Sequence, residues 1–137
     1  MYDSSLLGRS KELEVAGALI RNGIYVYYPL VDTGADLVAA NREATAFIPV
    51  QVRYRAASPA LNLFRKEVVR FKGTNSVIAF LVGGTSWYLQ FSKWVTKAVD
   101  PDRRDQRVYV RIAENQRWLA QFEGDVGLRQ TFSLLVG

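Results

Sequence analysis

Apolar and polar residues follow several different periods along this chain, and each period predicts an element. Residues 9–22 show the spacing of an amphipathic helix, with Ser10 as the expected N-cap and Gly23 as the stop signal. The expected buried face of this helix consists of Leu13, Ala16, Gly17 and Ile20. The chain is therefore predicted to open with a helix that buries one face.

Short runs that are mostly apolar or rich in β-branched and aromatic residues follow the helix and predict six strands. These runs are residues 24–28, 35–40, 46–55, 77–82, 87–91 and 108–112. Pro49 lies inside the third run and indicates an edge strand or a bulge. The Gly83-Gly84 turn joins the fourth and fifth runs, which should form a hairpin.

The remaining segments are less regular. Residues 60–73 fit either a pair of strands or a short helix. Residues 93–99, with Ser92 as a cap, and residues 114–122 favour further helices, while residues 101–106 read as a charged loop. No internal repeat or domain boundary interrupts the order, so residues 1–137 are expected to form one α/β domain with strands in the middle.

Composition narrows the chemistry that this domain can perform. The chain has no Cys and no His, which excludes disulfides, thiolate metal sites and His general bases. An enzyme built from this chain must use carboxylates, amides, Lys or Arg, and these groups suit a hard cation. No apolar run approaches the roughly 18 residues of a membrane span, and the N-terminus lacks a signal peptide, so a cytoplasmic protein is expected.

Positive charge is concentrated along the chain. The formal net charge is +5, and six cations but a single acid, Glu67, lie between Arg53 and Lys72. A second group of cations consists of Lys93, Lys97, Arg103, Arg104, Arg107 and Arg111. Basic stretches with interleaved aromatics are typical of surfaces that bind a phosphate backbone, and a solvated basic face without a partner remains the alternative.

Four polar residues fall in or beside the first helix and strands. Taken singly, Asp36 can cap a turn, Gln51 can face solvent, and Glu12 can serve the helix dipole. Arg53 follows Gln51 at i+2 and therefore shares its face of the strand. Taken together, two acids, an amide oxygen and a cation on neighbouring elements can hold Mg²⁺ against a phosphate and stabilise its developing charge.

The spacing of these residues resembles that of a known superfamily. The matching features are Gly8 four residues before Glu12, Gly23 before an aromatic strand, Asp36-Leu37-Val38, and Gln51-Val52-Arg53. In this order they resemble the PD-(D/E)-x-K nuclease superfamily, and are similar to archaeal Holliday-junction resolvases and to the small proteins related to group I intron homing endonucleases. The resemblance covers residues 7–55.

The resemblance implies a restriction-endonuclease-like core, with a central mixed β-sheet flanked by helices, and metal-dependent hydrolysis of DNA. It implies Mg²⁺ or Mn²⁺ held by Asp36, Gln51, the Val52 carbonyl and Glu12, with Asp32 as a further neighbour and Arg53 as the catalytic cation. The expected partners are DNA and, as a homodimer or higher homo-oligomer, further copies of the chain. Cations expected to grip DNA are Lys11, Arg55, Arg65, Lys66, Arg70 and Lys72.

Arg53 stands where the superfamily has Lys, and Gln51 where many members have Glu. Arg cannot lose its proton, so it fails as a base but can clamp a phosphate through two hydrogen bonds. Two hypotheses follow. The chain is an active endonuclease with a Gln-x-Arg site, or a catalytically degenerate nuclease fold that binds nucleic acid or protein.

Overall fold

The computed structural model describes residues 4–31, 34–100 and 107–136. Along the chain the elements are α1 (Ser4–Arg21), β1 (Tyr25–Tyr27), β2 (Leu37–Ala40), β3 (Phe47–Arg55), β4 (Ala60–Phe64), α2 (Arg65–Phe71), β5 (Val77–Val82), β6 (Thr85–Gln90), α3 (Phe91–Lys97), β7 (Arg107–Arg111), η1 (Ala113–Asn115), α4 (Gln116–Leu119), η2 (Ala120–Phe122), α5 (Gly124–Thr131) and η3 (Ser133–Leu135). The expected Asp32 and the loop 101–106 lie outside the described residues.

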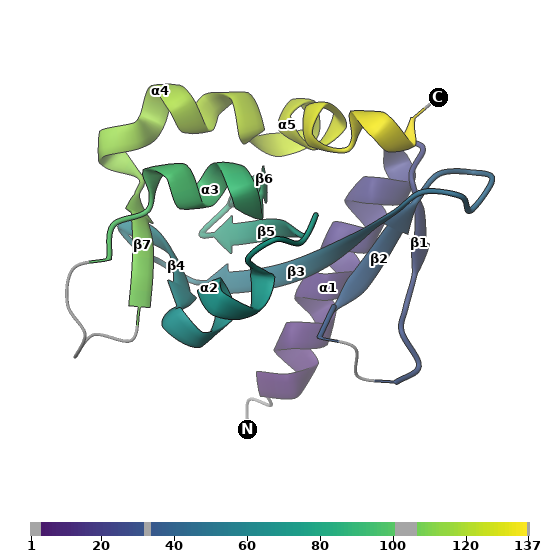
Figure 1. Cartoon of the computed structure of the whole chain (residues 1–137), viewed down its shortest axis with the longest axis horizontal. Helices are drawn as coiled ribbons and strands as arrows, with labels where there is room; N and C mark the ends of the chain where they lie inside the picture. Colours follow the sequence, from purple (N-terminus) through teal and green to yellow (C-terminus); the bar gives the residue numbers. More distant parts are fainter. Residues whose placement is uncertain (1–3, 32–33, 101–106, 137) are drawn as a thin grey trace.

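The strands form two sheets (Figure 1). Five strands make the central sheet in the order β1-β2-β3-β5-β6, and β4 pairs with β7 in a separate two-stranded sheet. Strands β3 and β5 run parallel, whereas every other pair in the central sheet is antiparallel. The central mixed sheet flanked by helices that the sequence predicted is therefore confirmed.

The central sheet is covered on both faces, and two hydrophobic cores result. Helices α1 and α5 pack on one face, while α3 and the β4–β7 sheet pack on the other. Strand β5 shows the division, because Ala79 faces the first core and Phe80, its neighbour, faces the second. A strand buried on both faces reads as a continuous apolar run, which is how residues 77–82 appear in the sequence.

Helix α1 differs from its prediction in two respects. It begins at Ser4, so Ser10 lies inside it and donates its hydroxyl hydrogen to the Leu7 carbonyl at 2.7 Å instead of capping the helix. The buried face is also different and consists of Val15, Ala16, Ala18 and Leu19. Of the predicted core positions, Ala16 is confirmed as buried and Gly17 is exposed. Leu13 and Ile20 are 54% and 62% exposed, because the helix turns its alanine-bearing side towards the sheet.

The other elements follow the sequence with local corrections. Residues 60–73 are neither a strand pair nor a helix alone, since β4 leads directly into α2. The predicted hairpin of β5 and β6 is confirmed. Pro49 lies in a central strand and not in an edge strand, but β5 pairs with β3 only from Val50 onward, so at Pro49 only β2 flanks the strand.

The C-terminal segments are more broken than predicted. Helix α3 begins at Phe91, so Ser92 lies inside the helix and is not its cap. The helix expected over residues 114–122 is a succession of the short elements η1, α4 and η2. Within the described residues, no helix has the length and apolar character that crossing a bilayer requires.

Candidate active site

The candidate site forms where β3 extends past the end of β2. The two strands pair from Phe47 to Val50 of β3, so the β3 edge beyond Val50 has no partner strand on that side. Asp36 lies just before β2, and its backbone N–H donates to the Val50 carbonyl at 3.1 Å. Its Oδ2 accepts the Val52 N–H at 2.8 Å. Asp36 thus bonds two backbone groups at the open edge of β3, and these bonds hold its side chain against Val52.

Helix α1 adds a second carboxylate. Glu12 lines one small hollow together with Asp36, Val52 and Arg53. Burial raises the pKa of the Glu12 carboxyl, the negative charge of Asp36 raises this pKa further, and Arg9 lowers it. The structure therefore brings the two predicted acids into one site, where the charge of Asp36 opposes the ionisation of Glu12.

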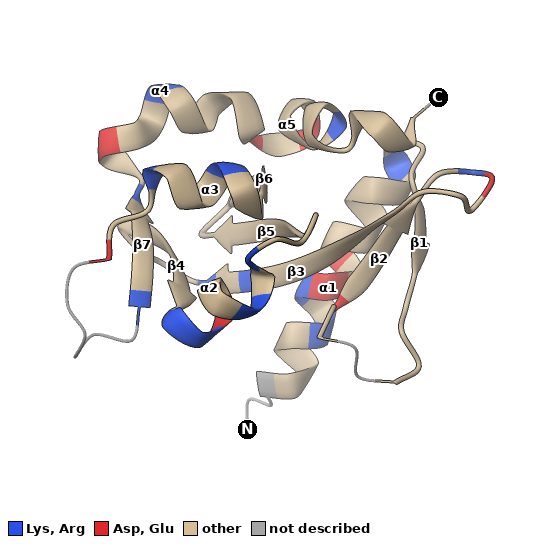
Figure 2. Cartoon of the chain, viewed as in Figure 1, with Lys and Arg blue, Asp and Glu red and all other residues tan. Residues whose placement is uncertain are grey.

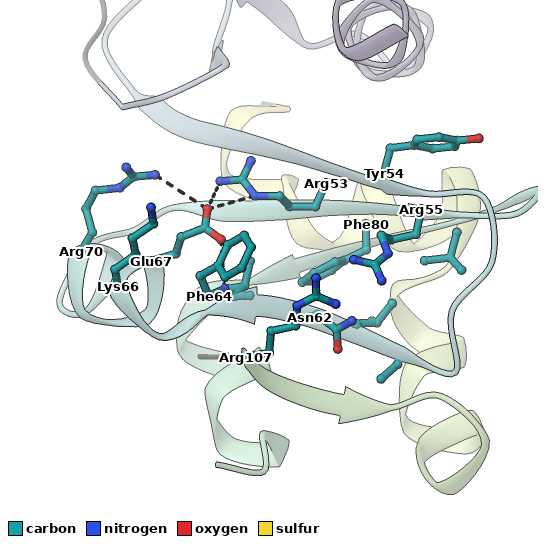
Figure 3. A pocket seen from close by; sticks show the side chains of 14 residues that line it. Arg53, Tyr54, Arg55, Asn62, Phe64, Lys66, Glu67, Arg70, Phe80 and Arg107 are labelled. Atoms are coloured by element: carbon teal, nitrogen blue, oxygen red, sulfur yellow. Dashed lines mark hydrogen bonds and ion pairs between the residues drawn. The ribbon is translucent and has the colours of Figure 1, made fainter. Parts of the chain in front are cut away.

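Arg53 connects this site to α2. Its Nη1 donates to Asp36 Oδ2 at 3.3 Å and to the Val52 carbonyl at 2.9 Å. Its Nε donates to Glu67 Oε2 at 3.1 Å, and its Nη2 donates to the same oxygen. The guanidinium is consequently shared between the carboxylates of Asp36 and Glu67. Figure 3 shows its contacts with Glu67.

Glu67 is a site residue that the sequence reasoning did not select. Its side chain is buried, and Oε1 accepts the Phe64 N–H at 3.1 Å near the start of α2. Arg70 approaches Oε2 at 4.0 Å. A signal was present, because Glu67 is the single acid in the basic segment between Arg53 and Lys72. An isolated acid among cations is a candidate partner for one of them.

One alternative placed Gln51 on the solvent face of the strand, but the structure buries this residue. The residue is 3% exposed, and its Nε2 donates to the Gly34 carbonyl. A buried amide needs such a partner, because an unsatisfied amide destabilises the fold. The bond to Gly34 engages the nitrogen and leaves Oε1 as the atom of Gln51 that can act as a ligand.

The donor chemistry fits a hard divalent cation. Mg²⁺ prefers oxygen ligands and is commonly bound by one or two carboxylates while it keeps several waters. Glu12, Asp36, Gln51 and Val52 offer such oxygens, although no three acidic side chains in the described part of the chain converge as a metal cluster. Arg53 Nη1 already bonds two of these oxygens, Asp36 Oδ2 and the Val52 carbonyl. A metal at those two atoms requires the guanidinium to move.

The cations expected to bind DNA do not all lie together. Arg55, Lys66 and Arg70 line a pocket of about 450 Å³ next to Arg53 (Figure 3). Lys11 lies at the active-site hollow, 4.5 Å from the centroid of the Tyr54 ring.

Two of the expected DNA-binding cations take other positions. Arg65 forms an ion pair with Asp100 at 2.6 Å and is not among the residues that line the pocket. Lys72 is an exposed residue at the C-terminal end of α2. Arg107 of β7, which was not on the list of expected contacts, lines the pocket instead. Figure 2 shows the cations gathered along α2, below the central sheet.

Comparison with known proteins supports the fold. No protein-family model matches the sequence, and no curated protein matches it. Among solved structures, the chain is similar to the Holliday junction resolvase Hjc of Archaeoglobus fulgidus, with a TM-score of 0.56 and 15% sequence identity. The similarity covers 77% of this chain and 84% of the resolvase. The chain therefore has the restriction-endonuclease-like fold of this resolvase.

Proposed function

We propose that this protein is a metal-dependent endonuclease that hydrolyses DNA phosphodiester bonds. The observation that carries the proposal is the meeting of Glu12, Asp36 and the Val52 carbonyl at the open edge of β3, with Gln51 adjacent in the strand. A basic pocket adjoins this edge and suits a phosphate backbone. The fold shared with a resolvase supports a nuclease function in general.

Each residue has a distinct proposed role. Asp36, Gln51, Glu12 and the Val52 carbonyl would hold Mg²⁺ or Mn²⁺, which would supply a water of lowered pKa and take up charge on the phosphate. Arg53 binds an oxygen of the scissile phosphate and keeps its charge throughout, since Arg does not release a proton. Glu67 grips Arg53 through Nε and Nη2 and so positions Nη1 towards the reacting group.

A second candidate function rests on the same arginine. Nη1 occupies two of the proposed metal ligands, so the guanidinium can permanently replace the ion. The protein would then bind DNA through its basic pocket and cleave nothing. This alternative predicts binding that weakens steeply with salt and is independent of divalent metal.

A plasmid-nicking assay separates the two functions. Supercoiled and branched DNA are incubated with Mg²⁺ or Mn²⁺ and wild type, Asp36→Ala or Arg53→Lys. Arg42→Lys serves as the matched control, because Arg42 is exposed in the turn between β2 and β3. Cleavage that disappears in Asp36→Ala, but persists in the control, supports the nuclease.

Other results point to the alternative. If wild type does not cleave DNA but Arg53→Lys does, the arginine blocks a site that can otherwise cleave DNA. If no variant cleaves DNA and DNA binding is independent of metal, the protein has the second function and only binds DNA. Equal cleavage by wild type and Asp36→Ala refutes the proposed site, since Asp36 is its central ligand.

The homodimer expected from the sequence also remains a proposal. Leu6, Leu13 and Ile20 recur every seven residues on α1 and are 69%, 54% and 62% exposed. Residues at this spacing lie on one side of a helix, and an apolar stripe of this kind is the seam through which helices pair. This stripe is the surface of the chain that we propose for self-association.

A further inference from the structure

The β4–β7 sheet presents an outer face that the proposed active site does not use. Side chains alternate along both strands, so Leu63 and Val108 point into the second core. Phe64 and Arg107 are paired across the sheet, as are Asn62 and Tyr109. These four side chains therefore share the outer face.

Aromatic rings and guanidinium groups are interleaved on this face. The Arg107 guanidinium lies 5.6 Å from the centroid of the Phe64 ring, and Lys66 approaches the same ring at 5.8 Å. The Arg111 guanidinium lies 5.1 Å from the centroid of Tyr109. Phe64 is 43% exposed, so a planar group can still reach its ring. Rings flanked by cations are the surface on which nucleic-acid bases stack.

Two adjoining hollows connect this face to the candidate active site. The pocket in Figure 3 begins at Arg53 and shares Arg55, Asn62 and Arg107 with a second hollow. The second hollow extends along β7 to Arg111. Figure 3 shows the side chains of Arg55, Asn62 and Arg107 directed into the same space, although they come from three different strands. The two hollows form one continuous track.

The charges along this track favour a polyanion. Glu67 is the single acid among the described residues that line the two hollows, and Arg53 already engages it. Arg55 forms no ion pair with any described residue, and Arg111 has one exposed partner, Glu114, at 3.7 Å. The described side chains along the track therefore carry a net positive charge, which attracts a ligand that carries several negative charges.

We propose that the outer face of the β4–β7 sheet binds single-stranded nucleic acid. Phe64 and Tyr109 stack on unpaired bases, while Arg55, Arg107 and Arg111 bind the phosphates between them. The inference rests on the proposed function in one respect, namely that the partner is nucleic acid. It adds the substrate class: a strand with unpaired bases beside the cleavage site, such as the single-stranded part of a branched DNA.

The geometry favours a single strand over a duplex. Bases in a duplex cover each other's faces and expose only their edges, so a flat ring on a sheet cannot stack on them. Phe64 and Tyr109 occupy diagonal positions of the ladder, which are about 7–8 Å apart. Stacked bases rise about 3.4 Å per nucleotide along a strand. This separation of ladder positions is wider than that of stacked bases, so it suits bases that have been drawn apart.

A binding experiment tests the inference without relying on cleavage. A labelled oligothymidylate of about 12 nucleotides is titrated in EDTA and followed by fluorescence anisotropy, beside a duplex of equal length. One stacked base contributes about 1–3 kcal/mol, so Phe64→Leu and Tyr109→Leu should each weaken single-strand binding about fivefold or more. Duplex affinity should change less than about twofold. Phe47→Leu is the matched control, because Phe47 is 48% exposed on the distant end of β3.

The phosphate contacts have their own readout. Arg55→Gln should lower the slope of log affinity against log salt by about one, whereas Arg42→Gln should leave the slope unchanged. Unchanged oligothymidylate affinity in both ring variants, or an equal loss for duplex, overturns the inference even if the protein cleaves DNA. If wild type binds neither DNA, this inference and the proposed function fail together. Circular dichroism confirms that each variant is folded.

Discussion

Removing the Arg53 guanidinium should destabilise the fold, because it leaves the buried Glu67 carboxylate without its main partner. The carboxylate of Glu67 is nine-tenths buried, and its Oε2 accepts hydrogen bonds from both Nε and Nη2 of Arg53. In Arg53→Met, the Glu67 carboxylate keeps the hydrogen bond from the Phe64 N–H at 3.1 Å and the ion pair with Arg70 at 4.0 Å. Neither can replace a guanidinium that bonds the buried oxygen directly.

The size of the effect follows from burial. Breaking a buried pair by removing one partner generally destabilises by about 3–5 kcal/mol, since a buried charge is left uncompensated. The Arg53 side chain is 27% exposed and Arg70 is close enough to compensate in part, so we expect about 2–3 kcal/mol, at or below the lower end of this range. At about 4 °C per kcal/mol for a domain of this size, Tm should fall by about 8–12 °C.

Urea and thermal unfolding of four proteins measure this quantity. They are wild type, Arg53→Met, Glu67→Met and the double variant. The double variant removes both charges, so it should recover at least about 1.5 kcal/mol relative to the sum of the single effects. Arg21→Met is the control, because its pair with Asp125 is exposed on both sides and should contribute little to stability. Additive single effects would show that Arg53 and Glu67 do not stabilise the fold as a pair.

Three further predictions concern other parts of the molecule. Gly127→Ala should destabilise strongly, because its Cβ would lie 1.9 Å from the Phe122 carbonyl carbon, whereas Gly17→Ala, with nothing within 4 Å, should stabilise α1 by about 0.5–1 kcal/mol in urea unfolding. Burial raises the pKa of Glu12 above 4.5, so its ionisation weakens the folded state as pH rises; Glu12→Gln should reduce that loss of stability between about pH 4.5 and pH 7. Leu13→Glu should lower the sedimentation mass if the proposed stripe on α1 forms the dimer, and an unchanged dimer would exclude that surface.

The strands that carry the motif could be predicted because their signals are local. Residues 35–40 and 46–55 are bounded by turn residues. The first run is mostly apolar, and the second carries the β-branched residues Ile48, Val50 and Val52. The helix was also predictable, but its buried face was not. Leu13 and Ile20 are seven residues apart, and Val15 and Leu19 are four apart. Both spacings keep side chains on one side of a helix, so the period alone offers two faces. The position of the sheet decides between them.

The parts of the site that were missed depend on contacts between distant segments. Glu67 reaches Arg53 because α2 folds back over β3, and Arg107 reaches the pocket because β7 pairs with β4. No spacing in the sequence encodes either approach. Arg65 shows the converse, since it belongs to the basic segment but turns towards Asp100. Charge density along a chain thus identifies a basic region without identifying which side chains share a surface.

The two departures from the superfamily pattern act together on the charge around Asp36. Gln51 removes a negative charge from the proposed ligands, which weakens the attraction for a divalent ion. Arg53 adds a permanent positive charge that already bonds Asp36 Oδ2 and the Val52 carbonyl. An ion and the guanidinium therefore compete for these two oxygens. Under the proposed function, a DNA phosphate resolves the competition, because it offers Nη1 another anion while Glu67 keeps the rest of the guanidinium in place. Substrate binding and metal binding would then favour each other at one arginine.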